Sequence, residues 1–339
     1  MVTRAEVRKL QRLGSKSLVV SLPRSWVKKQ GLQPGDMAYV IEEYDKIIVM
    51  PYRKQGEPTA SEVTVNLDAV LDDEGHVPPE IIGRQIVGCM YILGIDNFVL
   101  KSRKLDPDKL FDIIRESGMP TAGVDIDVRE GGVRVSSIID VNRLEPTLAI
   151  RNLARIVLRQ IDYLLDYVEG RLTNVKEIHD KIMRGMEDVR VLERLIMRSL
   201  IGPKSLVENL DVRHIYSLFG AAILMVMAND FISRDLLWLA QSRKKPGKDA
   251  VQYLNQVRGL LEDAVNLTVN PSITKAKDLY KTLDNLESSV NEAMNGAGDA
   301  DARLLMTVYH VLRINRIVAY IGFCLGLSKS KAVERPGGK

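Results

Sequence analysis

Apolar residues recur at every third or fourth position in the last part of the chain. From about Glu145 onward the pattern includes Leu153, Ile156 and Val157, and this spacing is typical of amphipathic helices. Glycine and proline residues interrupt the pattern and divide it into six predicted helices. The pattern predicts an all-α domain over residues 144–330.

Two of these predicted helices carry the same apolar stripe, displaced by 86 residues. Each stripe has a 4-3-4-3-4-3 spacing and contains one asparagine at the same step. The members are Leu218, Ala222, Met225, Asn229, Ile232, Leu236 and Leu239 in the first stripe, and Leu304, Val308, Val311, Asn315, Val318, Gly322 and Leu325 in the second. A duplication that produced two three-helix units, packed as tandem bundles, explains the repeat.

The two asparagines have a structural and a functional interpretation. An asparagine on a buried stripe fixes helix register through one hydrogen bond. Two polar groups at matched positions could also line a ligand or metal pocket, but the stripes supply no carboxylate for a metal. The register role is therefore favoured. Asp162 and Asp166, which share one helix face, are expected on the solvated side.

The pattern before the helices is different, because strand and helix signals alternate. Over residues 60–141 two strand-like runs, "EVTVNL" and "DNFVLKS", are each followed by a helical segment, and a hairpin through Gly131-Gly132 completes a βαβαββ order. This order predicts a small α/β domain. Because it has no glycine-rich phosphate-binding pattern, a packing or sensing role is favoured over catalysis.

The first segment, residues 1–54, alternates short strands with tight turns. A strand over Ser17–Leu22, a helical turn "RSWVKKQ", a "GLQPGD" turn with Gly35 at positive φ, and strands over Met37–Ile41 and Lys46–Met50 are predicted. The core of such a segment is small, so dimerisation is expected. The whole chain is predicted to be a multi-domain α+β protein that ends in a disordered tail, residues 331–339.

The amino-acid composition is that of a soluble globular protein, and a cytoplasmic location is expected. The chain of 339 residues is 45% hydrophobic and 27% charged, and no signal peptide is expected. The apolar run Leu218–Ala228 is about half of the ~20 residues that a membrane-spanning helix needs, so the chain is not expected to be an integral membrane protein. Cys89 and Cys324 lie in apolar runs and are predicted to be core thiols.

Catalytic chemistry is not indicated. The histidines His76, His179, His214 and His310 are scattered over different elements, and none has the spacing of a nucleophile pair or a metal site. The sequence therefore predicts no enzyme, no catalytic residue, no metal and no cofactor.

Charge is distributed unevenly along the chain. Residues 1–54 contain 11 Lys/Arg and 5 Asp/Glu, a net charge of +6, whereas the remaining residues contain 37 Lys/Arg and 39 Asp/Glu, a net charge of −2. A basic excess that is confined to one segment, and a segment with several predicted turns, favours an anionic partner for that segment.

Residues 7–51 resemble the AbrB/MazE swapped-hairpin (SpoVT-AbrB) domains. The resemblance rests on "LGSKSLVVSLP", the short helix, "GLQPGD" and the terminal "IIVMP" strand. It implies a homodimer through this domain that binds DNA, with Gln11 as the best candidate for reading bases. The basic residues at the matching positions are Arg8, Lys9, Arg12, Lys16, Arg24 and Lys28.

Residues 145–330 are similar to the PhoU family, whose fold is two three-helix bundles. The whole chain resembles archaeal-type PhoU-related regulators. The acidic residues of that family's metal-binding motif are missing here, because "NDFIS" and "NRIVA" occupy its place in the stripe register. The resemblance implies a DNA-binding transcriptional regulator linked to phosphate uptake, with a helical region that senses a signal or docks on a phosphate transporter or signalling protein. The alternative is an interaction protein of phosphate transport, in which the hairpin domain mediates dimerisation or protein binding.

Overall fold

The computed structural model consists of a small N-terminal β domain followed by a mostly helical region. It describes residues 6–14, 17–43, 46–52, 63–71, 78, 81–117, 122–139, 144–201 and 212–329. The chain forms two compact units, Met1–Pro58 and Thr59–Lys339. Lys16 and the predicted tail lie outside the described residues. The separation of the predicted domains 60–141 and 144–330 stays a prediction.

The N-terminal unit contains two antiparallel strand pairs and one helix. Its elements are β1 (Gln11–Leu13), β2 (Ser17–Val19), α1 (Arg24–Gln30), β3 (Ala38–Glu43) and β4 (Lys46–Pro51). The β3–β4 hairpin and α1 are confirmed, and Gly35 has the expected positive φ, 97°. The strand predicted to reach Leu22 ends at Val19, and β1 was not predicted, because three residues are too short for a recognisable alternation.

The α/β part of the second unit follows the predicted βαβαββ order. Its elements are β5 (Val63–Asn66), η1 (Leu67–Ala69), η2 (Ile81–Val87), α2 (Gly88–Ile92), β6 (Asn97–Lys101), α3 (Pro107–Glu116), β7 (Val124–Arg129) and β8 (Gly132–Ser137). The sheet order is β5-β6-β8-β7, with β5 and β6 parallel and the other pairs antiparallel. The hairpin turn is Glu130-Gly131 and not Gly131-Gly132, because Gly132 pairs with Arg129 in the ladder.

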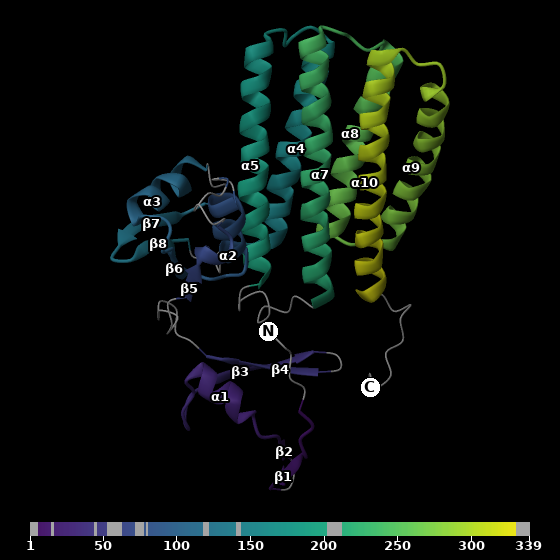
Figure 1. Ribbon diagram of the computed structural model, residues 1–339. Helices are drawn as coiled ribbons and strands as arrows, with labels where there is room; N and C mark the ends of the chain where they lie inside the picture. Colours follow the sequence, from purple (N-terminus) through teal and green to yellow (C-terminus); the bar gives the residue numbers. More distant parts are fainter. Residues whose placement is uncertain are drawn as a thin grey trace. The chain divides into compact units, whose positions relative to one another are not determined.

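Six long helices form the rest of the described chain (Figure 1). They are α4 (Pro146–Val168), α5 (Val175–Ile201), α7 (Val212–Ser242), α8 (Lys248–Val269), α9 (Ile273–Met294) and α10 (Asp299–Lys329). Helices α4, α5 and α7 pack on one another, as do α8, α9 and α10. Contacts of α7 with α10 and of α4 with α8 join these two groups, so one hydrophobic core extends through all six helices.

Both repeated stripes are buried, as the spacing predicts. The amide nitrogen of Asn315 donates to the Val257 carbonyl oxygen at 3.3 Å, which is a single cross-helix bond of the expected kind. The Asn229 amide has no partner among the described residues. Gly322 lies where α10 approaches α8 closely, since a Cβ atom there would stand 2.8 Å from the Leu267 backbone.

The apolar run Leu218–Ala228 belongs to an apolar helical segment that is longer than predicted from the sequence. Two helical segments, Ile215–Ser242 and Asp299–Leu327, are long and apolar enough to cross a membrane by length and composition, and core helices of soluble bundles meet the same criterion. The expectation of a run only half as long as a membrane span is therefore wrong. Buried polar residues such as Ser233, Asp235 and Thr307 favour the core-helix interpretation.

One further side-chain expectation is wrong and another is incomplete. Asp162 and Asp166 are partly exposed, as expected, but each also forms an ion pair: Asp162 accepts two hydrogen bonds from Arg258 of α8, at 2.6 and 3.1 Å, and Asp166 pairs with Arg171. Cys89 and Cys324 are free and exposed rather than buried. Both cysteines lie in apolar runs, but the helix turns these positions away from the core.

Buried arginine contacts hold the α/β part against α5. Arg198 is 1% exposed, donates to the Tyr91 carbonyl oxygen at 2.7 Å, and forms an ion pair with Asp96. Its guanidinium carbon lies 4.6 Å from the centroid of the Tyr91 ring, within the range of a cation–π contact. One turn earlier, Arg194 donates to the Arg84 carbonyl oxygen at 2.9 Å.

Tyr167 ties the end of α4 to the end of α7, and its removal tests this packing. Its buried hydroxyl group lies 2.7 Å from the Leu239 carbonyl oxygen and 3.0 Å from that of Lys244. We expect Tyr167→Phe to lower the free energy of unfolding by about 1 kcal/mol, because the substitution removes the hydroxyl hydrogen bond, while the Leu239 carbonyl oxygen keeps the Lys244 N–H and the Ser242 hydroxyl as donors. Urea denaturation measures the change. Tyr216→Phe, at a residue that is 72% exposed, is the matched control, and an equal effect in both variants would contradict the assignment.

Candidate nucleic-acid interface

The predicted basic residues that the structure describes lie in and just before β1 and in α1 of the N-terminal unit. Lys9 precedes β1, Arg12 is in β1, and Arg24 and Lys28 are in α1. Arg24 and Lys28 are four residues apart, so they project from one face of this short helix. Pro23 immediately precedes α1 as its N-cap residue, and Gly31, with a left-handed backbone, ends the helix, so both cations lie on a helix whose two ends are set by local turns.

Arg8 differs from the other predicted contacts. Its guanidinium forms an ion pair with Glu6 and donates to the Ser21 hydroxyl oxygen at 2.9 Å. These bonds link the segment before β1 to the segment after β2. The charge of Arg8 is thus partly used within the unit, and its predicted DNA contact stays a prediction.

The other cations are available to a partner. The side chains of Lys9, Arg12, Arg24 and Lys28 are exposed, and no acidic side chain of the described residues forms an ion pair with them. Lys16 was predicted with them but lies outside the described residues. Four unpaired cations on one small unit create a positive surface that attracts a polyanion such as the phosphate backbone of a nucleic acid.

Gln11, the candidate for base recognition, is also exposed. It pairs with Val19 across the β1–β2 ladder, whereas its neighbour Arg12 pairs with Leu18. Successive strand residues point to opposite faces, so Gln11 and Arg12 project from opposite sides of the two-stranded ribbon. A single groove of a duplex would not meet both side chains in one protomer.

The N-terminal unit also exposes apolar side chains. None of the residues whose burial is described in it is buried, and Leu18 and Val40 are 64% and 68% exposed. A groove of about 440 Å³ beside α1 is lined largely by apolar residues, among them Leu22, Trp26 and Val49. A single copy of this unit therefore does not bury its own apolar surface.

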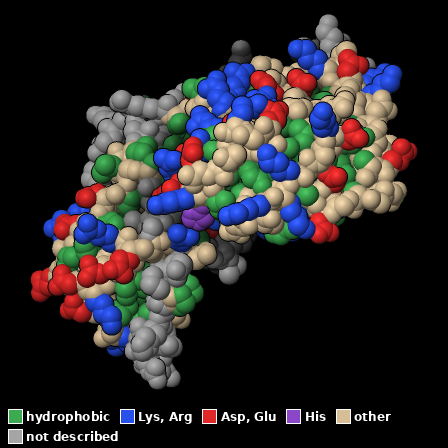
Figure 2. Space-filling view, turned by 90° about the horizontal axis from the view of Figure 1, so that it is seen from above, with side chains coloured by type: hydrophobic (Ala, Val, Ile, Leu, Met, Phe, Trp, Pro, Cys, Tyr) green, Lys and Arg blue, Asp and Glu red, His purple; other side chains and the backbone are tan. Residues whose placement is uncertain are grey.

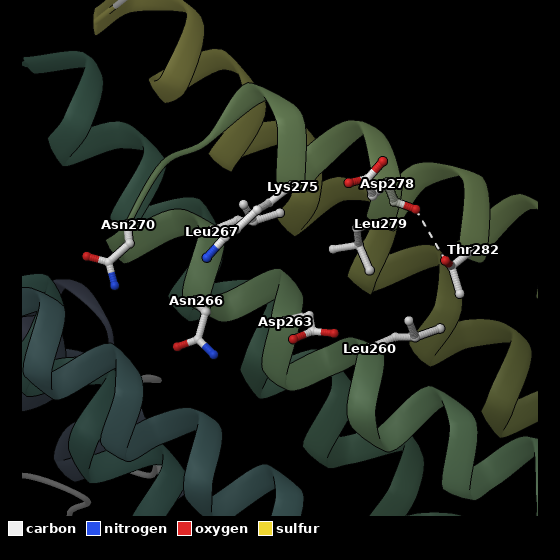
Figure 3. Close-up of a pocket in the computed structure, with 9 residues that line it drawn as sticks. All are labelled: Leu260, Asp263, Asn266, Leu267, Asn270, Lys275, Asp278, Leu279 and Thr282. Carbon is white, nitrogen blue, oxygen red and sulfur yellow. Dashed lines mark hydrogen bonds between the residues drawn. The ribbon is translucent and has the colours of Figure 1, made fainter.

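The second unit carries charges of both signs on its surface. On the face that Figure 2 shows, a group of Lys and Arg side chains gathers in one area, and basic and acidic side chains lie intermixed elsewhere. A groove of about 580 Å³ between α8 and α9 is lined by exposed polar groups, including Asp263, Lys275 and Asp278 (Figure 3). Among the described residues no group of three or more His, Cys, Asp and Glu side chains could hold a metal ion.

The comparisons with known proteins concern the N-terminal unit. Residues 11–57 match the family model described as antidote-toxin recognition MazE, bacterial antitoxin. No curated protein and no solved structure matches the chain. The match supports the predicted AbrB-like domain and a regulator that binds DNA or acts as an antitoxin. The PhoU resemblance of the helical region is not confirmed, and the link to phosphate has no support.

Proposed function

We propose that the protein is a cytoplasmic transcriptional regulator that binds duplex DNA through a dimer of its N-terminal units. The single observation that carries this proposal is the set of exposed, unpaired cations on a unit whose sequence matches an antitoxin family. Domains of this type typically dimerise and bind DNA or toxins. The PhoU resemblance of the helical region supports a sensing or docking role for that region.

Dimerisation follows from the exposed apolar surface. Burying apolar surface contributes about 25 cal/mol per Å², and this unit has no described buried side chain with which to stabilise itself alone. A second copy would cover residues such as Leu18 and Val40. It would also double the basic residues about a two-fold axis, which suits a pseudo-palindromic DNA site.

The direct test measures binding of the full-length protein to a duplex taken from upstream of its own gene. Affinity should fall steeply as salt is raised, because binding releases the counterions that the phosphates hold. Eight basic residues from the four exposed positions of two protomers give an expected slope of log affinity against log salt of about −7, and the two Lys16 residues would steepen it to about −9. A salt-independent affinity, or no binding to duplex DNA, would refute the proposal.

A protein partner for the N-terminal unit is the second candidate function. The apolar groove beside Trp26 favours it, because such a groove suits an apolar peptide segment better than a phosphate backbone. A partner that is captured by the full chain and lost on deletion of residues 1–54, together with absent DNA binding, would favour this candidate. Capture that survives the deletion would instead assign the interaction to the helical region.

Val40→Asp is expected to weaken the dimer roughly a hundredfold. The Val40 side chain lies in β3 and is 68% exposed in the single chain, so a dimer that uses this face would bury one valine from each protomer. An aspartate at this position would lose the burial energy of both valines, and the two carboxylates would repel each other. Analytical ultracentrifugation measures the dissociation constant. Val128→Asp, at an exposed valine in β7, is the matched control. Unchanged dimerisation in Val40→Asp would exclude this face from the dimer.

A further inference from the structure

A polar groove of about 350 Å³ lies between α4 and α5. Each helix contributes four residues with the spacing i, i+3, i+4, i+7, beginning at Ile156 in α4 and at Lys181 in α5. This spacing places all eight residues on the two facing ridges of the helix pair. The volume falls within the usual range of small-molecule sites.

The lining of this groove is predominantly basic. Arg159 from α4 and Lys181 and Arg184 from α5 line it, and Asp188 is the one acidic residue of the described lining. Lys181 pairs with Glu177 at 3.2 Å and lies 4.8 Å above the Tyr163 ring. Arg184 donates its Nε–H to the Asp180 carbonyl oxygen at 3.2 Å, and no described acidic side chain forms an ion pair with Arg159 or Arg184, so the remaining guanidinium N–H groups can bind an anion.

A buried amide occupies the floor of the groove. Gln160 is 1% exposed, and no described group donates a hydrogen bond to its Oε1 atom. The amide lies against α5 at Gly185, where any Cβ atom would stand 1.6 Å from the Gln160 nitrogen. The glycine therefore makes room for the amide. A buried carbonyl oxygen without a donor is unfavourable, and a ligand that carries a donor would satisfy it.

We propose that the α4–α5 groove binds a small molecule that carries an oxyanion, either a carboxylate or a phosphate, next to a hydroxyl group. The arginines on the rim pair with the oxyanion, for which the planar guanidinium is well suited. The hydroxyl group donates to Gln160 Oε1. This inference is independent of DNA binding, because no residue of the N-terminal unit takes part in it.

Isothermal titration of the full-length protein tests the site with two probes, glycerate and glycerol 3-phosphate. We expect at least one of them to bind at millimolar concentration or below, and the tighter probe identifies the preferred oxyanion. Glycerol lacks the charge and propanoate lacks the hydroxyl group, so both should bind more weakly. Failure of both probes to bind, or binding of glycerol as tight as that of the anions, would overturn the proposal.

Variants locate the binding in this groove. Arg159→Gln with Arg184→Gln should weaken the bound probe about tenfold or more, because charge-assisted hydrogen bonds are lost. Gln160→Leu should remove the preference for glycerate over propanoate. Lys277→Gln with Lys281→Gln on α9 removes the same charge from an exposed surface and should change nothing. Equal binding by the arginine variant and this control, with unchanged helical content, would overturn the site, and an intact preference in Gln160→Leu would refute the role of the amide.

Discussion

Replacing both Arg12 and Lys28 by alanine is expected to weaken binding to duplex DNA at least about tenfold, and by the same factor on every sequence tested. Both side chains are exposed and have no described ion-pair partner, so their substitution removes charge without removing an internal bond. A dimer loses four phosphate contacts, and the salt slope should become less steep by about 4. Fluorescence anisotropy at several salt concentrations measures both quantities.

Two comparisons make this result specific. Lys277→Ala with Lys281→Ala removes the same charge from α9 and should leave DNA binding unchanged. Arg8→Ala should have a smaller effect than Arg12→Ala, because Arg8 already pairs with Glu6 and Ser21. A variant that changes sequence preference but not the salt slope would show that these residues read bases rather than phosphates.

Arg198→Ala is expected to destabilise the second unit by about 3–5 kcal/mol. The substitution leaves a cavity, removes the donor of the Tyr91 carbonyl oxygen, and removes the ion-pair partner of Asp96. Asp96→Ala should cost less, since the carboxylate is 46% exposed and partly screened by solvent, although it leaves the guanidinium buried without its counter-charge. Urea denaturation followed by circular dichroism measures both changes.

The control for this prediction is Lys176→Ala, an exposed position on the same helix. Hydrogen exchange should also increase in α2 and β6 of the Arg198→Ala variant, because these segments lose their attachment to α5. A loss of stability below about 1 kcal/mol, with unchanged exchange in α2, would show that the arginine does not hold the α/β part in place.

The regular features of the fold could be predicted from the sequence. The repeated stripes depend on helical spacing alone, and the structure buries all of their members. The β3–β4 hairpin and the βαβαββ order also follow from local turn and strand signals. In contrast, Cys89 lies among apolar residues but is exposed. Its exposure could not be predicted, because five residues of α2 are too few to show which face of the helix is buried.

The features that depend on tertiary register could not be predicted. Arg194 and Arg198 share one face of α5 within an apolar stretch, and this spacing was the available signal for their burial against the α/β part. In the α4–α5 groove Gln160 meets Gly185, and no local pattern specifies which residues of two helices face each other. Among the basic residues, the sequence could not show that Glu6 holds Arg8.

The two cysteines give direct access to motion inside the second unit. Cys89 on α2 and Cys324 on α10 are the only cysteines of the chain, and both are exposed. Maleimide dyes attached at these native positions would form a donor–acceptor pair without any engineered substitution. Energy transfer between the dyes would report whether the α/β part shifts relative to the end of α10 when DNA or a small anion is added.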